Sequence, residues 1–291
     1  MPEIPDLEAI RHFLEPRLRG NPVASMEARI PWLVRTGADS LGTLVGHAFT
    51  EVRRTGKFLL FATDDARLLV VNPMLTRRFH WAEPAERKRP LTGLILGFAD
   101  GHELRYSDAR RMGRFYLVAA DALATVPQFA ELGPDALAVD EATFLKRLAR
   151  HSGQIKSTLT NQKFIAGIGN AYSDEMLWEA GLHPHRRRAT MGVEEQRRPF
   201  AAMRSTLVWA QPLVEEQARE RLYQDNREWR AHLRVHHRAE QPCPRCGHAI
   251  QGQTRGGSET NYCLRCQPLL GEAKARARAA EGAGAGEEPS G

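Results

Sequence analysis

Residues 243–266 read CPRCGHAIQGQTRGGSETNYCLRC and hold all four cysteines of the 291-residue chain. The C-x2-C pairs Cys243/Cys246 and Cys263/Cys266 are separated by sixteen residues, a spacing that can place four thiolates tetrahedrally around one Zn²⁺. The alternatives are two disulfides or a redox pair, but disulfides are unusual in the cytoplasm and a redox pair rarely comes doubled. We predict a structural zinc hairpin, a motif that serves protein contacts as well as DNA.

Upstream of the cysteines, residues 155–172 join two helix candidates through a glycine-rich turn. Gly167 and Gly169 permit a tight backbone and close approach by a partner. Asn170 stands where the next helix begins and can cap it, and exposed N–H groups at a helix start bind phosphate. Taken alone, the segment favours a plain corner between two helices with Asn170 as its cap.

The first part of the chain alternates between apolar and polar residues in short segments. A helix is expected over residues 6–13, with Pro16 limiting its extension. Strands are expected over 58–62, 68–72, 91–99, 104–107 and 113–118. Asp100-Gly101 joins two of them as a hairpin and supplies the positive φ of a type I′ turn. Several short strands at close spacing indicate a β-sandwich or a barrel.

Past about residue 120 the hydrophobic pattern becomes helical. Helices are expected over 141–149, 155–159, 170–180, 193–210 and 213–221. Pro212 should break the long run after residue 193. Residues from 271 onward are low in complexity and are expected to form a disordered tail. The prediction is an α+β multidomain chain with a β-sandwich domain (1–125), a helical domain (126–235), a zinc β-hairpin (236–268) and a tail (269–291).

Charge and composition narrow the class of partner. The net charge of +6 and the pI of about 9.4 suit a polyanion such as nucleic acid. The chain has no apolar run of about 18 residues, so a transmembrane helix and a membrane partner are not expected. The N-terminal MPEIPDLE is acidic and lacks the apolar run of a signal peptide. We therefore expect a cytoplasmic protein.

Three separated segments together resemble the formamidopyrimidine-DNA glycosylase and endonuclease VIII family. They are Met1-Pro2-Glu3-Ile4-Pro5-Asp6, then Gln162-Lys163 ahead of Gly167-Ile168-Gly169-Asn170-Ala171-Tyr172, and the paired C-x2-C hairpin. The resemblance covers residues 1 to 268 and implies that the helical domain is a helix-two-turns-helix domain. It further implies a base-excision repair DNA glycosylase and AP lyase with one structural Zn²⁺, which acts as a monomer on damaged double-stranded DNA at the nucleoid.

The resemblance implies catalysis by the chain terminus. Removal of Met1 would expose the amine of Pro2, and such an amine has a pKa of about 7.7–8.0, so a useful fraction is neutral near pH 7. A neutral secondary amine can attack C1′ of a damaged nucleotide and expel the base, leaving an iminium ion. That cation acidifies the C2′ proton, and β,δ-elimination follows. Glu3 matches the family's acid/base residue for the sugar ring oxygen. Lys57 matches a lysine that contacts phosphate beside the lesion.

Other matched residues are expected to bind DNA. Base removal requires a nucleotide to leave the stack, and the family fills the hole with three side chains, matched by Met74, Arg110 and Met112. Arg110 would pair with the orphaned base, and Met112 stands where the purine-acting branch usually has Phe; a core methionine and a basic surface loop are the alternatives. Asn170 and Lys156 are expected to contact the backbone, which positions the duplex without reading sequence.

Several positions depart from the family pattern. Asp6 replaces a usual Glu, and Val71-Asn72-Pro73 stands where His-Leu-Gly is common. Ser258 occupies the place of a phosphate-binding Arg, for which Arg255 could substitute on the same hairpin. Oxidised purines such as 8-oxoguanine and formamidopyrimidines are the favoured lesions. The alternatives are an oxidised-pyrimidine glycosylase and a non-catalytic binder of damaged DNA. A zinc-containing RNA-binding or ribosome-associated protein would leave the N-terminal motif unexplained.

Overall fold

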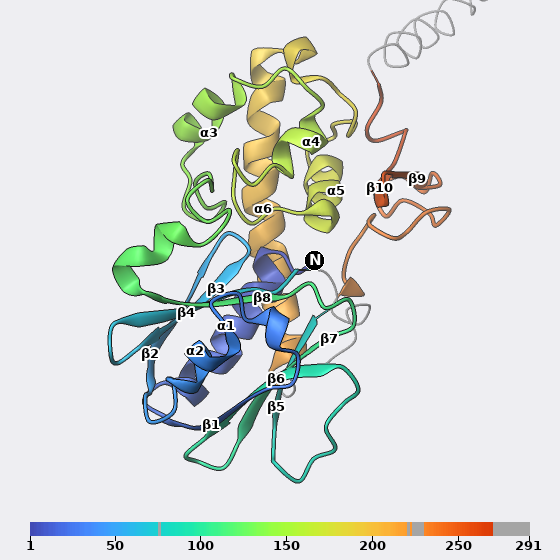
Figure 1. Cartoon of the computed structure of the whole chain (residues 1–291). Helices are drawn as coiled ribbons and strands as arrows, with labels where there is room; N and C mark the ends of the chain where they lie inside the picture. The colour runs from blue at the N-terminus through green and yellow to red at the C-terminus, as the bar shows by residue number, and fades with distance from the viewer. Residues whose placement is uncertain (75–76, 220–221, 223–229, 270–291) are drawn as a thin grey trace, which may run out of the picture. The chain divides into compact units, whose positions relative to one another are not determined.

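The computed structural model describes residues 1–74, 77–219, 222 and 230–269, which form two compact units (Figure 1). The first unit contains the described residues of 1–139, 161–169 and 207–232, and the second those of 140–160, 170–206 and 233 onward. The predicted tail lies, from residue 270 on, outside the described residues. Among the described helices, none is both long and apolar enough to cross a membrane.

Two four-stranded antiparallel sheets form the first unit and confirm the predicted β-sandwich. One sheet has the order β1-β6-β7-β5, made of β1 (Val23–Ala28), β6 (Thr92–Phe98), β7 (Glu103–Asp108) and β5 (Arg77–Ala82). The other has the order β2-β3-β4-β8, made of β2 (Phe49–Thr55), β3 (Phe58–Thr63), β4 (Arg67–Asn72) and β8 (Arg114–Ala119). The unit also contains the short helices η1 (Pro31–Leu33), α2 (Ala38–Gly42) and η2 (Ala120–Thr125).

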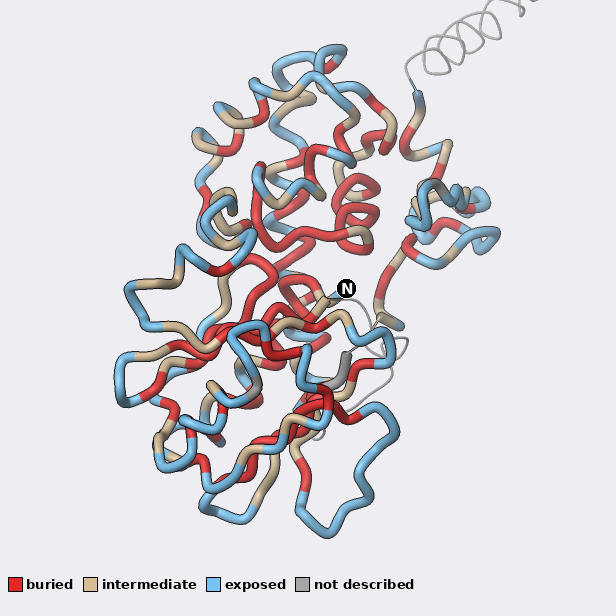
Figure 2. Tube along the Cα trace, viewed as in Figure 1, coloured by how far each residue is buried: buried red, intermediate tan, exposed pale blue. Residues whose placement is uncertain are grey.

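The core of the first unit lies between these sheets and includes α1. Successive side chains of a strand point to opposite faces, so Leu59 and Phe61 of β3 enter the core shared with the other sheet, while Phe58 and Leu60 pack on the outer side. Buried positions accordingly concentrate along the strands in Figure 2. The sandwich is therefore covered on both faces where β3 runs.

Helix α1 spans Ile4–Leu18 and is longer than the 6–13 segment predicted from sequence. The backbone N–H of Glu3 donates to Asp6 Oδ2 at 2.8 Å, which fixes the first turn. The expectation that Pro16 limits the helix was wrong. Pro16 is exposed, so the carbonyl that loses its partner can meet water, while Leu14 and Leu18 are fully buried and hold the last turn.

The turn between β6 and β7 also differs from the prediction. Gly101 has a positive φ of 88°, but Asp100 does not, so a type I′ turn is absent here. Instead, residues 99–102 form a longer loop in which Asp100 Oδ1 accepts the N–H of His102 at 3.0 Å. The aspartate side chain holds the turn in place of a second residue with positive φ.

The second unit is helical and carries the zinc hairpin. Its elements are α3 (Glu141–Leu148), α4 (Ile155–Leu159), α5 (Asn170–Glu179), η3 (Arg188–Thr190), β9 (Gln251–Arg255) and β10 (Ser258–Tyr262). Helix α6 (Val193–Ala218) contributes residues to both units. The predicted break of α6 at Pro212 was wrong. Pro212 is exposed, whereas Leu207, Val214 and Ala218 are buried along one side and keep the helix continuous.

Candidate functional site

The chain start is built around a buried carboxylate. Pro2 is half-buried, and the adjacent Glu3 is only 2% exposed. Glu3 Oε2 accepts the backbone N–H of Gly169 at 2.6 Å. A Cβ on residue 169 would lie 2.5 Å from Glu3 Cδ, so this position has no room for a side chain. Two of the sequence-predicted motifs, the N-terminal Pro-Glu and the Gly-Ile-Gly turn, therefore meet within the first unit.

A third group at the chain start was not predicted from sequence. Arg230 Nη2 donates to the Met1 carbonyl oxygen at 2.9 Å and to Asp6 Oδ2 at 3.3 Å, and lies 3.8 Å from Glu3 Oε1. Asp6 has a shorter side chain than the Glu that is usual at this position in the family. Its Oδ2 thus accepts hydrogen bonds from both the Glu3 N–H and this guanidinium. No local sequence signal joins residue 230 to residues 1–6, because the contact spans more than two hundred positions.

Lys57 is a buried cation of the same unit, only 6% exposed. Burial lowers its pKa to about 8; the charges of Glu3 and Asp6 oppose this shift, and that of Arg230 adds to it. The lysine follows the β2–β3 turn at Gly56 (φ 55°). It is therefore poised to lose its proton only slightly above neutrality.

The β2–β3 turn that carries Lys57 is fixed by a buried ion network. Arg54 forms two parallel hydrogen bonds to Asp135, at 2.5 and 2.8 Å, and a third to Glu8 at 2.6 Å. Asp135 also accepts the N–H of Gly56 at 2.8 Å. Bidentate pairs of this kind restrict both distance and orientation. The turn thus has a rigid support that involves α1.

A cavity of about 310 Å³ adjoins the chain start and contains two of the predicted residues. Met1, Lys57 and Met74 line it, together with Phe58, Asn72, Gln128, Glu131, Leu132, Asn161, Gln162 and Lys163. Met74 adopts a positive φ of 41°, and its N–H donates to Asn72 Oδ1 at 3.3 Å. Asn72, one of the departures from the family pattern, therefore supports the turn that presents Met74.

The loop carrying Arg110 and Met112 is organised by a buried aspartate that sequence reasoning missed. Asp108 is fully buried, and its carboxylate accepts the backbone N–H groups of Arg110 at 3.0 Å, Met112 at 2.8 Å and Gly113 at 2.7 Å. Arg110 is exposed and Met112 half-exposed. Gly113 packs against the Tyr106 ring and leaves no space for a Cβ. The loop is preformed, with its side chains outward.

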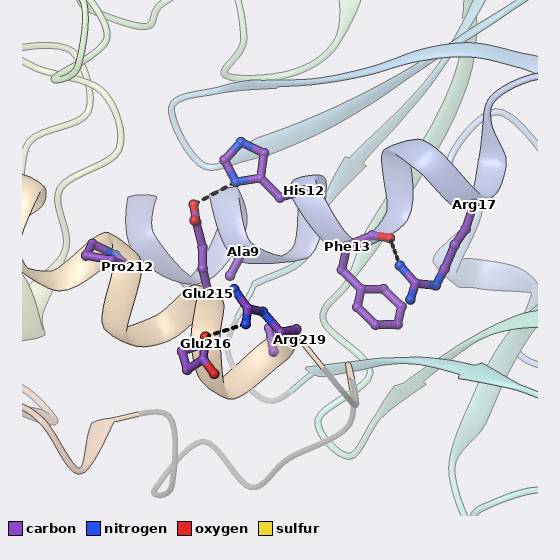
Figure 3. Close-up of a pocket in the computed structure, with 9 residues that line it drawn as sticks. Ala9, His12, Phe13, Arg17, Pro212, Glu215, Glu216 and Arg219 are labelled. Carbon is purple, nitrogen blue, oxygen red and sulfur yellow. Dashed lines mark hydrogen bonds and ion pairs between the residues drawn. The ribbon is translucent and has the colours of Figure 1, made fainter.

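A second cavity, of about 410 Å³, lies between α1 and the end of α6 (Figure 3). Figure 3 shows the ring of His12 facing the carboxylate of Glu215, and these groups are 2.6 Å apart. Arg17 stacks on the Phe13 ring at 3.7 Å. The acidic and basic side chains that line this second cavity lie next to each other. The cavity contains none of the residues predicted for the functional site.

In the second unit, two predicted DNA contacts are engaged with the zinc hairpin. Lys156 Nζ donates to Asp174 Oδ1 at 2.6 Å, to Thr260 Oγ1 at 2.9 Å and to the Glu259 carbonyl at 3.3 Å. Asn170 Nδ2 donates to the same carbonyl at 2.6 Å. A phosphate contact by Lys156 would have to compete with three protein acceptors. In this arrangement both side chains fasten β10 to the helices.

The four cysteines come together as predicted. Cys243 Sγ lies 3.8 Å from Cys266 Sγ, and Cys246 Sγ lies 3.5 Å from Cys263 Sγ. All four sulfurs are within 4.8 Å of one another. A tetrahedron of sulfurs at about 2.3 Å from Zn²⁺ has edges of about 3.8 Å, so the donor set fits this ion. With four thiolates no position stays open for substrate, and the site is structural.

Tryptophan 178 supports the zinc site from α5. Its indole N–H donates to Cys243 Sγ at 3.3 Å. Burial raises the pKa of Cys243, but this hydrogen bond and the N–H groups of Arg245 and Cys246 outweigh it and bring the pKa down to about 6. The thiolate form is thus favoured by the protein itself at Cys243. Burial raises the pKa of Cys263 and of Cys266, so at these two positions a bound Zn²⁺ would have to displace the thiol proton.

The hairpin turn contains both positions raised for the missing arginine. Ser258 is exposed at the start of β10, and its backbone pairs with Arg255 of β9. The side chain of Arg255 lies outside the described part, so its predicted role as a substitute stays a prediction.

Family comparisons cover most of the chain. Residues 1–115 match the formamidopyrimidine-DNA glycosylase N-terminal domain, residues 132–218 the H2TH domain of the same family, and residues 240–269 a zinc finger found in FPG and IleRS.

Curated relatives agree over nearly the full length. A formamidopyrimidine-DNA glycosylase of Heliobacterium modesticaldum is 33% identical over 92% of this chain and 100% of its own length. One of Moorella thermoacetica is 36% identical over 86% of this chain and 94% of its own length.

Solved structures show the same fold. The Lactococcus lactis Fpg, in complex with DNA containing an abasic site, is 28% identical with a TM-score of 0.84, covering 92% of this chain and 100% of its own. A structure of MutM with DNA containing carbocyclic 8-oxo-G has the same identity and coverage and a TM-score of 0.83.

Proposed function

The chain belongs to the formamidopyrimidine-DNA glycosylase family, and on this premise we propose that it is a base-excision repair DNA glycosylase and AP lyase that removes oxidised bases from double-stranded DNA. Oxidised purines, such as 8-oxoguanine and formamidopyrimidines, are its favoured lesions. The observation that carries the proposal is the hydrogen bond from the Gly169 N–H to the buried Glu3, the residue after Pro2, whose charge also acts on Lys57.

Once Met1 is removed, the Pro2 amine becomes the nucleophile. Its neutral form attacks C1′, the C1′–N bond to the base breaks, and the departing base takes up the proton that the Pro2 nitrogen loses when the new bond forms. Glu3 Oε2 accepts the Gly169 N–H, and the Glu3 side chain also accepts the backbone N–H of Asp6, so the carboxyl group is fixed at the chain start. From there it can give a proton to the sugar ring oxygen and later exchange protons during elimination.

Lys57 and the wedge residues position the nucleotide in this proposal. A phosphate would restore the full charge of the Lys57 ammonium, because an anion at contact distance raises the pKa that burial has lowered. Met74 and Met112 are apolar and flexible, so they can fill the space of a flipped nucleotide, while Arg110 is exposed and free to meet the orphaned base from its loop.

The zinc hairpin and the helix starts provide the backbone grip. The bound Zn²⁺ would cross-link the segments before β9 and after β10, which hold the two cysteine pairs, and supply folding energy, not chemistry. We propose that the protein works as a monomer on DNA of the nucleoid, as the family resemblance implies.

Borohydride trapping tests the enzymatic proposal directly. Met-processed protein should become covalently attached to DNA with an abasic site when borohydride reduces the iminium ion. Duplexes with 8-oxoguanine and with thymine glycol, cleaved in parallel, decide between the purine and pyrimidine specificities. Tight binding to the abasic duplex with no covalent product would favour a second candidate, a non-catalytic binder, which the replaced positions Val71 and Ser258 motivate.

A further inference from the structure

Arg230 lies outside the predicted motifs, and its side chain reaches the carbonyl group that precedes Pro2. Its Nη2 donates to Met1 O at 2.9 Å and to Asp6 Oδ2 at 3.3 Å. The guanidinium is about four-fifths buried, with 19% of its side chain exposed. Because the Asp6 contact does not involve Met1, it continues to hold the guanidinium at the chain start after the methionine is removed.

The Met1 carbonyl group imitates part of the covalent reaction intermediate. Its carbon is bonded to the Pro2 nitrogen, and its oxygen is bonded to that carbon. When Pro2 has attacked a nucleotide, C1′ takes the place of the Met1 carbon, and the sugar ring oxygen O4′ is the only hydrogen-bond acceptor left on C1′ once the base has gone. The oxygen that Arg230 now binds therefore occupies the kind of position in which O4′ would lie.

We propose that Arg230 is a catalytic residue that donates a hydrogen bond to O4′ while the sugar ring opens; this inference rests on the proposed glycosylase and lyase function. In that step the Pro2 nitrogen, which has already given its N–H proton to the departing base, uses its lone pair to form the N=C1′ bond, while the C1′–O4′ bond breaks and O4′ keeps the electron pair. Glu3 supplies the proton that turns O4′ into a hydroxyl. Arg230 stays protonated throughout and stabilises the negative charge that develops on O4′.

The surroundings of Arg230 suit this role. Glu3 Oε1 lies 3.8 Å from its Nη2, so the proton donor and the cation converge on the same oxygen. An arginine keeps its charge at every working pH and offers several N–H groups in a fixed plane, so one can hold Asp6 while another faces the sugar. A fixed positive charge next to the Pro2 amine also favours its neutral, nucleophilic form.

Three variants test whether Arg230 takes part in catalysis or only stabilises the side chain of Asp6. Arg230→Ala removes the guanidinium, and Arg230→Lys keeps the charge without the fork. Asp6→Asn keeps an acceptor for the Glu3 N–H but removes the charged partner of Arg230. Arg219→Ala is the control for loss of one positive charge, since that side chain is 75% exposed in the same unit.

Single-turnover trapping on abasic duplex at saturating enzyme is the measurement, with affinity for a tetrahydrofuran-containing duplex and a thermal melt recorded for each variant. Removing one preorganised donor to a developing oxyanion costs about 10²–10³ in rate, so Arg230→Ala should slow trapping about 100-fold. Arg230→Lys should recover part of this loss. The rate of trapping by Asp6→Asn should fall less than about fivefold. Affinity for the tetrahydrofuran-containing duplex should change less than about twofold in all variants, if one donor accounts for the loss of rate.

Two results overturn the inference. One is trapping by Arg230→Ala at the wild-type rate, and the other is trapping by Arg230→Lys at the wild-type rate, which would remove the need for a guanidinium. If Arg230→Ala does not fold, Arg230→Lys still decides in this way. Absence of trapping in the wild type would instead refute the proposed function, before the variants are compared.

Discussion

At the scale of single residues, Lys57 predicts how DNA binding depends on pH. Its pKa is about 8 because burial lowers it, and only the ammonium form attracts phosphate. Below pH 8 the free protein already carries this proton, whereas above pH 8 binding must first take a proton up. The dissociation constant for an abasic-analogue duplex should therefore rise above pH 8, by up to about tenfold per pH unit.

Lys57→Arg is the matched variant for this pH dependence, because a guanidinium stays charged over the whole range. Fluorescence anisotropy at fixed salt between pH 6.5 and 9.5, flanking the value of about 8, should show a steep rise for wild type and a flat profile for the arginine variant. Equal slopes for the two proteins would mean that Lys57 does not meet the phosphate.

The lack of space for a Cβ at Gly169 gives a second prediction at the scale of single residues. A Cβ at this position would lie 2.5 Å from Glu3 Cδ and 2.7 Å from Glu3 Oε1, so Gly169→Ala must displace the carboxylate. We expect single-turnover base release to fall on the order of 10²-fold, the usual size of a general acid–base contribution. Gly42→Ala is the control, since nothing lies within 4 Å of its Cβ. A comparable loss in the control, or unchanged base release in Gly169→Ala, contradicts the assigned role of Glu3.

Residue identity could be predicted where motif and chemistry agree, and not where a contact depends on the fold. The four cysteines stand out in the sequence because their type and spacing fit a zinc site, whereas Pro2 and Glu3 were identified only through the family resemblance. Arg230 carries no such signal, since one arginine among many gains its meaning only when it meets Met1 and Asp6. Asp108 was overlooked for a similar reason: its partners are backbone N–H groups, which every sequence contains.

At the scale of elements, we predict that the shape of the loop formed by residues 108–113 depends on the carboxylate of Asp108. Asp108→Asn replaces one acceptor oxygen by an NH2 group, which faces backbone N–H donors and leaves one or two of them unsatisfied. An unsatisfied buried donor costs about 1–3 kcal/mol. We expect a fall in thermal stability of that size and weaker discrimination of the base opposite the lesion, because Arg110 loses its fixed position.

Asp100→Asn provides the comparison for the loop variant, since Asp100 also accepts a backbone N–H, that of His102, but in the exposed β6–β7 turn. Cleavage of 8-oxoguanine duplexes with each of the four opposite bases is the measurement. If Asp108→Asn keeps the wild-type ranking of opposite bases, the buried carboxylate only stabilises the fold and does not position Arg110.

The helices show why element boundaries were harder to predict than element types. Pro16 and Pro212 each lack a backbone N–H and were expected to end or break a helix. Both lie on exposed sides of α1 and α6, where water can satisfy the carbonyl left over, and buried residues on the opposite side continue past them. Tertiary packing therefore outweighed a local signal that is sound for an isolated helix.

At the scale of the whole molecule, each compact unit is built from segments that are not consecutive in the sequence. Residues 161–169 and 207–232 belong to the same compact unit as the N-terminal strands, although segments of the second unit precede and follow each of them in sequence. Through these returns Gly169 and Arg230 reach Glu3 and Asp6. The order of strands, helices and cysteines was predictable, but this interleaving depends on contacts between distant residues.

The division into units predicts that binding and chemistry respond differently to loss of zinc. The cysteine site belongs to the second unit, whereas Pro2, Glu3 and Lys57 belong to the first. Without Zn²⁺ the hairpin should lose its order, and the Glu259 carbonyl that now binds Asn170 and Lys156 goes with it. We expect affinity for a tetrahydrofuran-containing duplex to fall about 10- to 100-fold, because each phosphate contact that is lost with the hairpin weakens the electrostatic binding of DNA.

Chelation of the metal from purified protein, compared with Cys263→Ser, tests whether DNA binding and chemistry respond differently to the loss of zinc. Tryptophan fluorescence reports the loss, because the Trp178 indole donates to Cys243 Sγ at 3.3 Å and would be released. At enzyme concentrations that saturate the abasic duplex, borohydride trapping should stay within a few-fold of the wild-type rate, since the proposed nucleophile Pro2 and the proposed acid Glu3 belong to the first unit. Trapping that disappears at saturation while affinity stays intact would show that zinc supports the chemistry itself, and the two units would then have to be treated as one catalytic assembly.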